Sequence, residues 1–165
     1  MVHPEEDKLA GMVIIDDYPL PRVSYRDVLI AVELKKDKRL GRIRINYGLG
    51  LESFIKNNIR KKSIIVINRG VRSVGRIRTI DNDYAIEIVR TQDSSLLQPV
   101  NSAVSILKRK KLFDTQQCPY KKEHLNLYLN ECCFKFNKRK SKEKWFDDLL
   151  QNAVNAEPFQ METDD

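Results

Sequence analysis

The chain has 165 residues, a net charge of +7, 41% hydrophobic residues and 32% charged residues. This length fits one domain with a core large enough to fold alone, and this composition is typical of a soluble globular protein rather than a disordered one. No run approaches the roughly 18 apolar residues of a membrane-spanning helix, and the N-terminus lacks the basic and apolar regions of a secretory signal peptide. We therefore expect an intracellular protein with no membrane association.

The first part of the chain has the pattern of strands followed by a helix. A short apolar run predicts a strand at 12–16, and a long run of Val, Ile and Leu predicts another at 27–34. Polar and apolar residues alternate over 42–48, as in a half-buried third strand. Apolar residues then recur at helical spacing over 48–59, which predicts a crossover helix.

The rest of the chain completes a sheet and then becomes helical. An apolar run at 61–68 predicts a central fourth strand, and a shorter run at 84–89 predicts a fifth. Helical patterns follow at 94–113, 122–140 and 141–154. Hairpins would join the first three strands, and the crossover helix would make the fourth strand parallel to the first. The sequence thus predicts an α/β fold with a mixed five-stranded sheet and flanking helices.

Charge and polarity suggest where the domain begins and ends. We expect a flexible leader at 1–10, the domain at 11–150, and an acidic, disordered tail at 151–165. Residues 105–144 hold twelve Lys and Arg against four Asp and Glu, whereas 145–165 hold six acids and no Lys or Arg. This asymmetry suits a nucleic-acid-binding surface followed by an acidic tail, but a solvated helix face explains it equally well.

The cysteines and histidines favour neither a disulfide framework nor a zinc site. Cys118, Cys132 and Cys133 suit buried thiols in a reducing compartment. With only His3 and His124 as histidines and no CxxC motif, the ligands of a zinc site are missing. We therefore expect inert thiols.

Polar residues follow the predicted first and fourth strands. "GMVIIDDYPL" places Asp16 and Asp17 after an apolar run, and "KKSIIVIN" ends in Asn68. In the predicted topology the C-terminal ends of these two strands are neighbours, and active sites of open α/β sheets gather at such ends. Asp16 is therefore either a metal ligand or a polar strand end without function.

Four motifs in order resemble the catalytic domain of the DDE transposases of small bacterial insertion sequences and of the related Merlin transposons. They are "IIDDY", "LESFIKNNIRKKSIIVIN", "NSAVSILKR" and "KEHLNLYLNECCFKFNKRK", and they span roughly residues 11 to 150. The resemblance implies a ribonuclease-H-like fold and a catalytic triad at Asp16, Asn68 and Asn101, with Lys108 in the place of a motif lysine. Such transposases also carry an N-terminal DNA-reading module, which this sequence lacks, so the resemblance suggests a transposase-derived, domesticated host protein.

The resemblance implies chemistry with two divalent metal ions about 4 Å apart, held by charged oxygen ligands. Two of the three implied positions carry amides, so we expect a degenerate, inactive triad in which Asp16 is a residual metal ligand and the ancestral Mg²⁺ or Mn²⁺ is lost. Rescue by another acid is the alternative. Asp17 would point to the opposite face of its strand, which leaves Asp81, Asp83 and Glu87 on or before the fifth strand as candidates.

Basic clusters after the third motif and in the last motif are candidates for phosphate contact. They could equally form a nuclear import signal or solvated helix ends. The candidate nucleic-acid-binding residues are Lys108, Arg109, Lys110, Lys111, Lys138, Arg139 and Lys140.

The leading hypothesis is a catalytically inactive transposase-derived domain that binds protein, DNA or both in a nuclear complex. It implies one or more protein partners and leaves a homodimer open. The alternatives are a protein-protein scaffold with no nucleic-acid role and a metal-dependent nuclease or transposase that works despite Asn68. An apolar stripe at Trp145, Phe146, Leu149 and Leu150 either completes the core or binds a partner.

Overall fold

The computed structural model describes residues 7–17, 28–37, 39–71, 77, 83–89, 94–109, 124–139, 150 and 154. The strands are β1 (Met12–Asp17), β2 (Val28–Leu34), β3 (Leu40–Tyr47), β4 (Ile64–Asn68) and β5 (Ala85–Val89), and the helices are α1 (Leu51–Asn58), α2 (Ser94–Arg109) and α3 (Leu125–Asn137). Among the described helices, none is long and apolar enough to cross a membrane. Most of the helix predicted at 141–154, and Cys118, lie outside the described residues.

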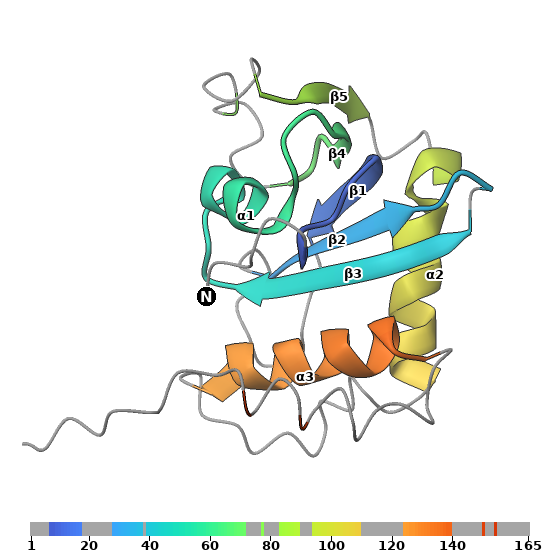
Figure 1. Ribbon diagram of the computed structural model, residues 1–165. Helices are drawn as coiled ribbons and strands as arrows, with labels where there is room; N and C mark the ends of the chain where they lie inside the picture. Colours follow the sequence, from blue (N-terminus) through green and yellow to red (C-terminus); the bar gives the residue numbers. More distant parts are fainter. Residues whose placement is uncertain are drawn as a thin grey trace, which may run out of the picture.

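The strands form one five-stranded sheet in the order β3-β2-β1-β4-β5 (Figure 1). β2 pairs antiparallel with β1 and β3, whereas β4 pairs parallel with β1 and β5. The predicted mixed α/β sheet is confirmed, including the parallel pairing of the first and fourth strands. It follows from the short β2–β3 connection at 35–39, the ten-residue β1–β2 connection at 18–27, which is shorter than a helical crossover requires, and a helical crossover through α1.

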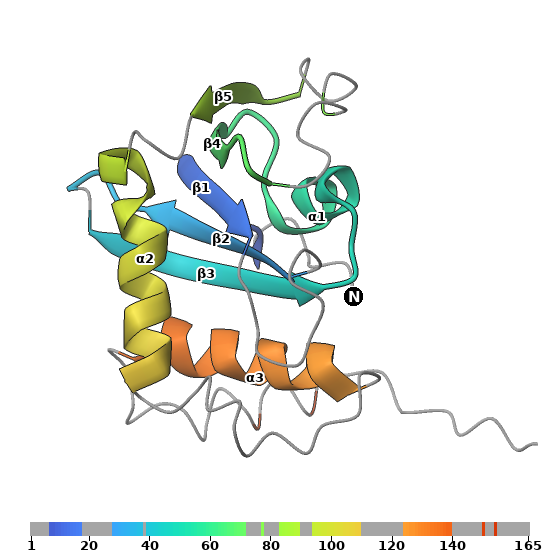
Figure 2. The same cartoon turned by 180° about the vertical axis from the view of Figure 1, so that it is seen from behind.

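The helices cover both faces of the sheet: α1 lies on one face, and α2 and α3 lie on the other (Figures 1 and 2). Because successive strand residues point to opposite faces, a strand contributes side chains to two hydrophobic cores, one on each face of the sheet. Ile14 and Val66 pack with the α2 and α3 residues, whereas Val13 and Ile65 pack with α1. Burial on both faces explains why β1, β2 and β4 are almost continuously apolar.

Residues 7–10, which we predicted to be part of a flexible leader, are instead held against the sheet. Leu9 is fully buried, its N–H donates to the Asn58 carbonyl over 2.8 Å, and its own carbonyl accepts from the Arg60 N–H over 2.8 Å. Arg42 also donates to the Lys8 carbonyl over 2.7 Å. The domain therefore begins several residues earlier than the apolar run of β1.

Side chains of α3 cover the backbone of the β3 edge. Asn126 both donates to and accepts from the backbone of Tyr47, at 3.0 Å and 2.8 Å. Asn137 does the same at Ile43, at 3.1 Å and 2.7 Å. Between them, the buried thiol of Cys133 accepts from the Ile45 N–H. An exposed strand edge can pair with another chain. At the β3 edge, side chains of α3 instead form hydrogen bonds with the backbone at alternate residues.

Candidate functional site

Asp16 and Asn68 meet at the C-terminal ends of β1 and β4. The two strands run parallel with Ile15 opposite Ile67, so the next residues lie side by side on the α2 face. Asn68 is 6% exposed, and its Nδ2 donates to Asp16 Oδ1 over 2.9 Å. The same Asp16 oxygen accepts the backbone N–H of Asp17 over 2.9 Å. The structure thus brings two of the three implied triad positions into direct contact.

A second hydrogen bond determines which way the Asn68 amide points. Asn68 Oδ1 accepts the backbone N–H of Gly70 over 3.1 Å. An amide oxygen accepts and an amide nitrogen donates, so turning the group over would set an N–H against the Gly70 N–H and an oxygen against the Asp16 carboxylate. The donor end of Asn68 therefore faces Asp16.

The Asp16 carboxyl has an unusual proton affinity. Burial raises the pKa of Asp16 from 3.8 to about 6, because a carboxylate loses solvation there. The hydrogen bonds from Asn68 and from the Asp17 backbone lower this pKa, while the negative charge of Asp17 raises it. Burial outweighs the hydrogen bonds, and Asp16 is poised to titrate just below neutral pH.

These residues do not fit a site with two divalent metal ions. Such ions bind oxygen ligands, preferably charged ones, whereas Asn68 presents an N–H donor to Asp16 and commits its oxygen to Gly70. Among the residues that the structure describes, no three His, Cys, Asp or Glu side chains are grouped so that they could hold a metal ion. A residual metal at Asp16 stays a prediction.

The other proposed ligands lie in different places, and one of them is outside the described residues. Asn101 is exposed on α2. Asp83 pairs with Lys61 over 3.1 Å, and Glu87 is in register with Val66 rather than with Asn68. Asp17 adjoins Asp16 along β1, and Asp81 lies outside the described residues. The described contacts of Asp16 at this end of the sheet are therefore with Asn68 and with its chain neighbour Asp17.

Most of the predicted nucleic-acid-binding side chains lie outside the described structure. The backbones of Lys108 and Arg109 form the end of α2, but their side chains are not described, and neither are Lys110, Lys111 and Lys140. The two described residues of this set lie at the end of α3, where Lys138 is half-buried at the C-cap.

The second of them, Arg139, has a structural role. Its guanidinium donates to the carbonyls of Leu40 and Gly41, over 2.8 Å and 3.2 Å, and to that of Phe136 over 2.9 Å. It also lies over the Phe136 ring, with 4.1 Å between the guanidinium carbon and the ring centroid. These contacts attach the end of α3 to the start of β3, while phosphate contact by Arg139 stays a prediction.

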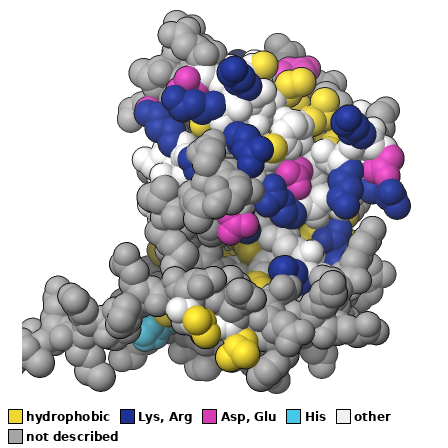
Figure 3. Space-filling view, viewed as in Figure 1, with side chains coloured by type: hydrophobic (Ala, Val, Ile, Leu, Met, Phe, Trp, Pro, Cys, Tyr) yellow, Lys and Arg dark blue, Asp and Glu magenta, His cyan; other side chains and the backbone are white. Residues whose placement is uncertain are grey.

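The structure also reveals basic residues that the sequence reasoning did not select. Lys and Arg side chains are spread over the face that α1 covers (Figure 3). Exposed members of this surface on and just after α1 are Lys56, Arg60, Lys61 and Lys62. Acids neutralise part of it, since Lys56 pairs with Glu52 over 2.6 Å. The run "RKK" was visible in the sequence, but its short length gave no reason to prefer it to the longer clusters.

Comparisons of this chain with models of known protein families, with curated proteins and with solved structures give no match. The site is therefore interpreted from its own geometry.

Proposed function

We propose that this chain is a transposase-derived domain of ribonuclease-H-like fold whose catalytic site has been converted into a hydrogen-bonded pair, and that it acts as a protein- or DNA-binding module in a nuclear complex. One observation carries the proposal: Asn68 donates to Asp16 at the strand ends where the related enzymes are expected to bind metal ions. A carboxylate in place of Asn68 would leave two like charges in contact, which a bound cation or a shared proton must compensate. The amide removes that need.

The order of the elements supports the proposed ancestry. An antiparallel β1–β2–β3 unit, a crossover helix and a parallel β4 place the polar ends of β1 and β4 side by side. The motifs in the sequence follow the same order, with the third motif on α2 and the fourth on α3. The strand order and the motif order thus agree with one another.

Substitution of Asn68 by Asp tests the ancestry. We expect Asn68→Asp to create a site for Mg²⁺ or Mn²⁺, measured as a rise in melting temperature on adding the metal and as heat in calorimetric titration. The double variant Asp16→Asn/Asn68→Asp is the matched control, because it keeps one carboxylate but removes the pair. Equal metal effects on the single and the double variant would contradict the proposed geometry.

The same protein tests whether catalysis survives. With Mn²⁺ or Mg²⁺ and nicked or branched DNA, the wild-type chain is expected to cleave nothing, even at high protein concentration. Cleavage that disappears in Asp16→Ala would instead establish the metal-dependent nuclease alternative.

Binding to DNA distinguishes the module from a pure protein scaffold. Phosphate contacts release counterions, so the affinity of a DNA-binding module falls steeply as salt rises. We expect Ala replacements across 108–111 to weaken binding more than Ala replacements at Arg60, Lys61 and Lys62, which remove similar charge elsewhere. Absent or salt-insensitive binding would favour the scaffold, and equal losses in both variants would indicate attraction by net charge alone.

A further inference from the structure

The tip of the β2–β3 hairpin projects beyond the paired part of the sheet. The last pair between β2 and β3 joins Leu34 to Leu40, and the pairing of β1 with β2 also ends at Leu34. Residues 35–39 lie beyond these pairs, to the right of α2 in Figure 1. The Lys35 N–H donates to the Arg39 carbonyl over 3.0 Å, which closes the turn. The tip is therefore a two-stranded ribbon held on strands of the core.

This tip is strongly basic. Its sequence, "KKDKR", has four basic residues and one acid. Lys35, Lys36 and Arg39 are exposed, while Lys38 lies outside the described residues. The acid, Asp37, forms an ion pair with Arg39 and accepts the Arg39 N–H over 3.1 Å. Because this pair balances the arginine, the two exposed lysines are the net positive charge of the described tip.

The next acid along β2 does not offset these lysines. The Glu33 carboxylate pairs with Arg42 over 3.2 Å and accepts the backbone N–H of Ala10 over 3.0 Å. These contacts hold the pKa of Glu33 below its usual range, against the effect of burial. Its charge is thus compensated at the start of the hairpin. Figure 3 accordingly shows Lys and Arg side chains along the edge of the molecule where β2 joins β3.

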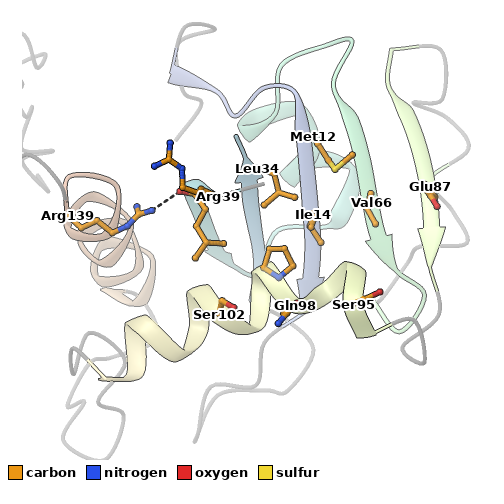
Figure 4. Close-up of a pocket in the computed structure, with 12 residues that line it drawn as sticks. Met12, Ile14, Leu34, Arg39, Val66, Glu87, Ser95, Gln98, Ser102 and Arg139 are labelled. Atoms are coloured by element: carbon orange, nitrogen blue, oxygen red, sulfur yellow. Dashed lines mark hydrogen bonds between the residues drawn. The ribbon is translucent and has the colours of Figure 1, made fainter. Parts of the chain in front are cut away.

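The end of α3 brings further positive charge to the base of the hairpin. Arg139 donates to the carbonyls of Leu40 and Gly41, over 2.8 Å and 3.2 Å. Figure 4 shows it on the same side of a groove as Arg39, and both arginines line that groove. Lys138 precedes Arg139 at the C-cap of α3. Since these carbonyls are uncharged, they hold Arg139 in place without neutralising it, and two segments far apart in the sequence form one basic surface.

We propose that this hairpin surface, formed by Lys35, Lys36, Arg39, Lys138 and Arg139, binds the phosphate backbone of duplex DNA. The inference rests on the proposed function and names the surface on which the DNA lies. Like charges repel one another, so a surface that gathers them from two segments favours a negatively charged partner. A two-stranded ribbon also fits the major groove of a DNA duplex, which is about 12 Å wide.

The length of the tip determines how many phosphates it reaches. Its five residues, 35–39, fold back on themselves, so the tip extends by two or three residues, or about 7–10 Å. One strand of a duplex carries a phosphate about every 3.4 Å along the axis, so this length faces about two or three phosphates. Lys35 and Lys36 supply a matching number of charges. Each neutralised phosphate steepens the dependence of log affinity on log salt concentration by about 0.9.

Removing the two lysines tests the hairpin surface. Affinity for a short duplex is measured by fluorescence anisotropy at several salt concentrations. Lys35→Ala/Lys36→Ala is expected to bind more weakly than the wild type, with a slope that is shallower by about 1.8. Lys56→Ala/Arg69→Ala is the matched control, because it removes the same charge from exposed side chains on α1 and after β4, and it should keep the wild-type slope. Equal losses in both variants would indicate attraction by net charge and overturn the inference.

Removing the acid of the tip gives a second test, in which binding is gained. Asp37→Asn frees the charge of Arg39 and keeps an oxygen for the Arg39 N–H, so binding should tighten and the slope should steepen by about 0.9. Glu52→Gln is the matched control, since both carboxylates belong to side chains that are 43% exposed and the Glu52 carboxylate pairs with Lys56. Equal effects of the two variants, or no effect of Asp37→Asn, would overturn the inference.

The outcomes separate this inference from the proposed function. A wild-type chain that binds no DNA, or binds it independently of salt, would contradict DNA binding by the module as well as the hairpin surface. Binding that weakens on Ala replacement across 108–111 but not in Lys35→Ala/Lys36→Ala would support the module and overturn the hairpin surface. Tighter binding to a single strand of the same length would overturn duplex DNA as the partner.

Discussion

Replacing Asp16 with Asn tests the electrostatics of the candidate site. The new amide oxygen can still accept the N–H groups of Asp17 and Asn68, which lie 2.9 Å from Asp16 Oδ1, so the shape and hydrogen bonds are kept. What changes is the charge, since burial raises the pKa of Asp16 from 3.8 to about 6. Ionising this carboxyl therefore costs folding free energy that the amide does not.

The sign and size follow from linkage between protonation and folding. When the folded pKa lies above the unfolded one, the stability associated with the group is fully present below the unfolded pKa and is lost as pH rises through the folded pKa. At 1.36 kcal/mol per pKa unit, the shift is worth up to about 3 kcal/mol. Asp16→Asn should therefore match the wild type below pH 3.8 and gain stability up to about pH 6, with a constant advantage above that.

Urea unfolding at a series of pH values, followed by circular dichroism, measures this difference. Asp83→Asn is the matched control, because the Asp83 carboxylate is 44% exposed and pairs with Lys61 on the surface, where such pairs contribute at most about 1 kcal/mol. A stability difference between Asp16→Asn and the wild type that does not change with pH would refute the reasoning. So would a loss of stability in Asp16→Asn at neutral pH.

Three further predictions concern the fold that supports the site. Asn137→Ala is expected to lower the free energy of unfolding in urea by about 1–3 kcal/mol, since it leaves the N–H and C=O of Ile43 without their side-chain partner. Leu127→Ala is the control: Leu127 is 64% exposed on the same helix, so its loss should cost about 0.5 kcal/mol or less. Gly41→Ala should destabilise the fold by about 1–3 kcal/mol, because the added Cβ would lie 2.8 Å from the Glu33 carbonyl oxygen. No change in stability would show that the backbone of the β2–β3 hairpin shifts to make room for the methyl group. Burial raises the pKa of Cys133 to about 12, so alkylation of this thiol, followed by peptide mass spectrometry, should proceed only as fast as the protein opens.

The sheet could be predicted from the sequence because each of its determinants is local. Short connections among the first three strands and a helical period between two apolar runs leave few topologies, and the parallel pairing of β1 and β4 follows. The packing of residues 7–10 was not predictable in this way, because Leu9 belongs to no periodic apolar pattern and its backbone bonds to the distant Asn58. The role of Asn137 was also hidden, although Asn126, Cys133 and Asn137 recur at spacings of seven and four, which place them in one row along α3.

The candidate site was predictable in position but not in its internal arrangement. Alternation along β1 and β4 is enough to place Asp16 and Asn68 side by side, whereas the direction of the Asn68 amide depends on the Gly70 N–H, two residues beyond the strand. A sequence motif carries no information about that contact. The motif therefore predicts that Asn68 occupies a ligand position, without showing that the amide donates to Asp16.

This donated hydrogen bond changes what the amide at position 68 means. Without Asn68, Asp16 would lose one of its two described hydrogen-bond donors, and a poorly compensated buried charge is costly. Asn68 instead lowers the pKa of Asp16 against the effect of burial, and it does so without a metal ion. With Asp at this position two carboxyls would share the site, and one of them would have to take up a proton or bind a cation. The amide at position 68 needs neither, because it compensates Asp16 with a donated hydrogen bond. This compensation agrees with the proposed non-catalytic binding module, which does not require a metal ion at the strand ends.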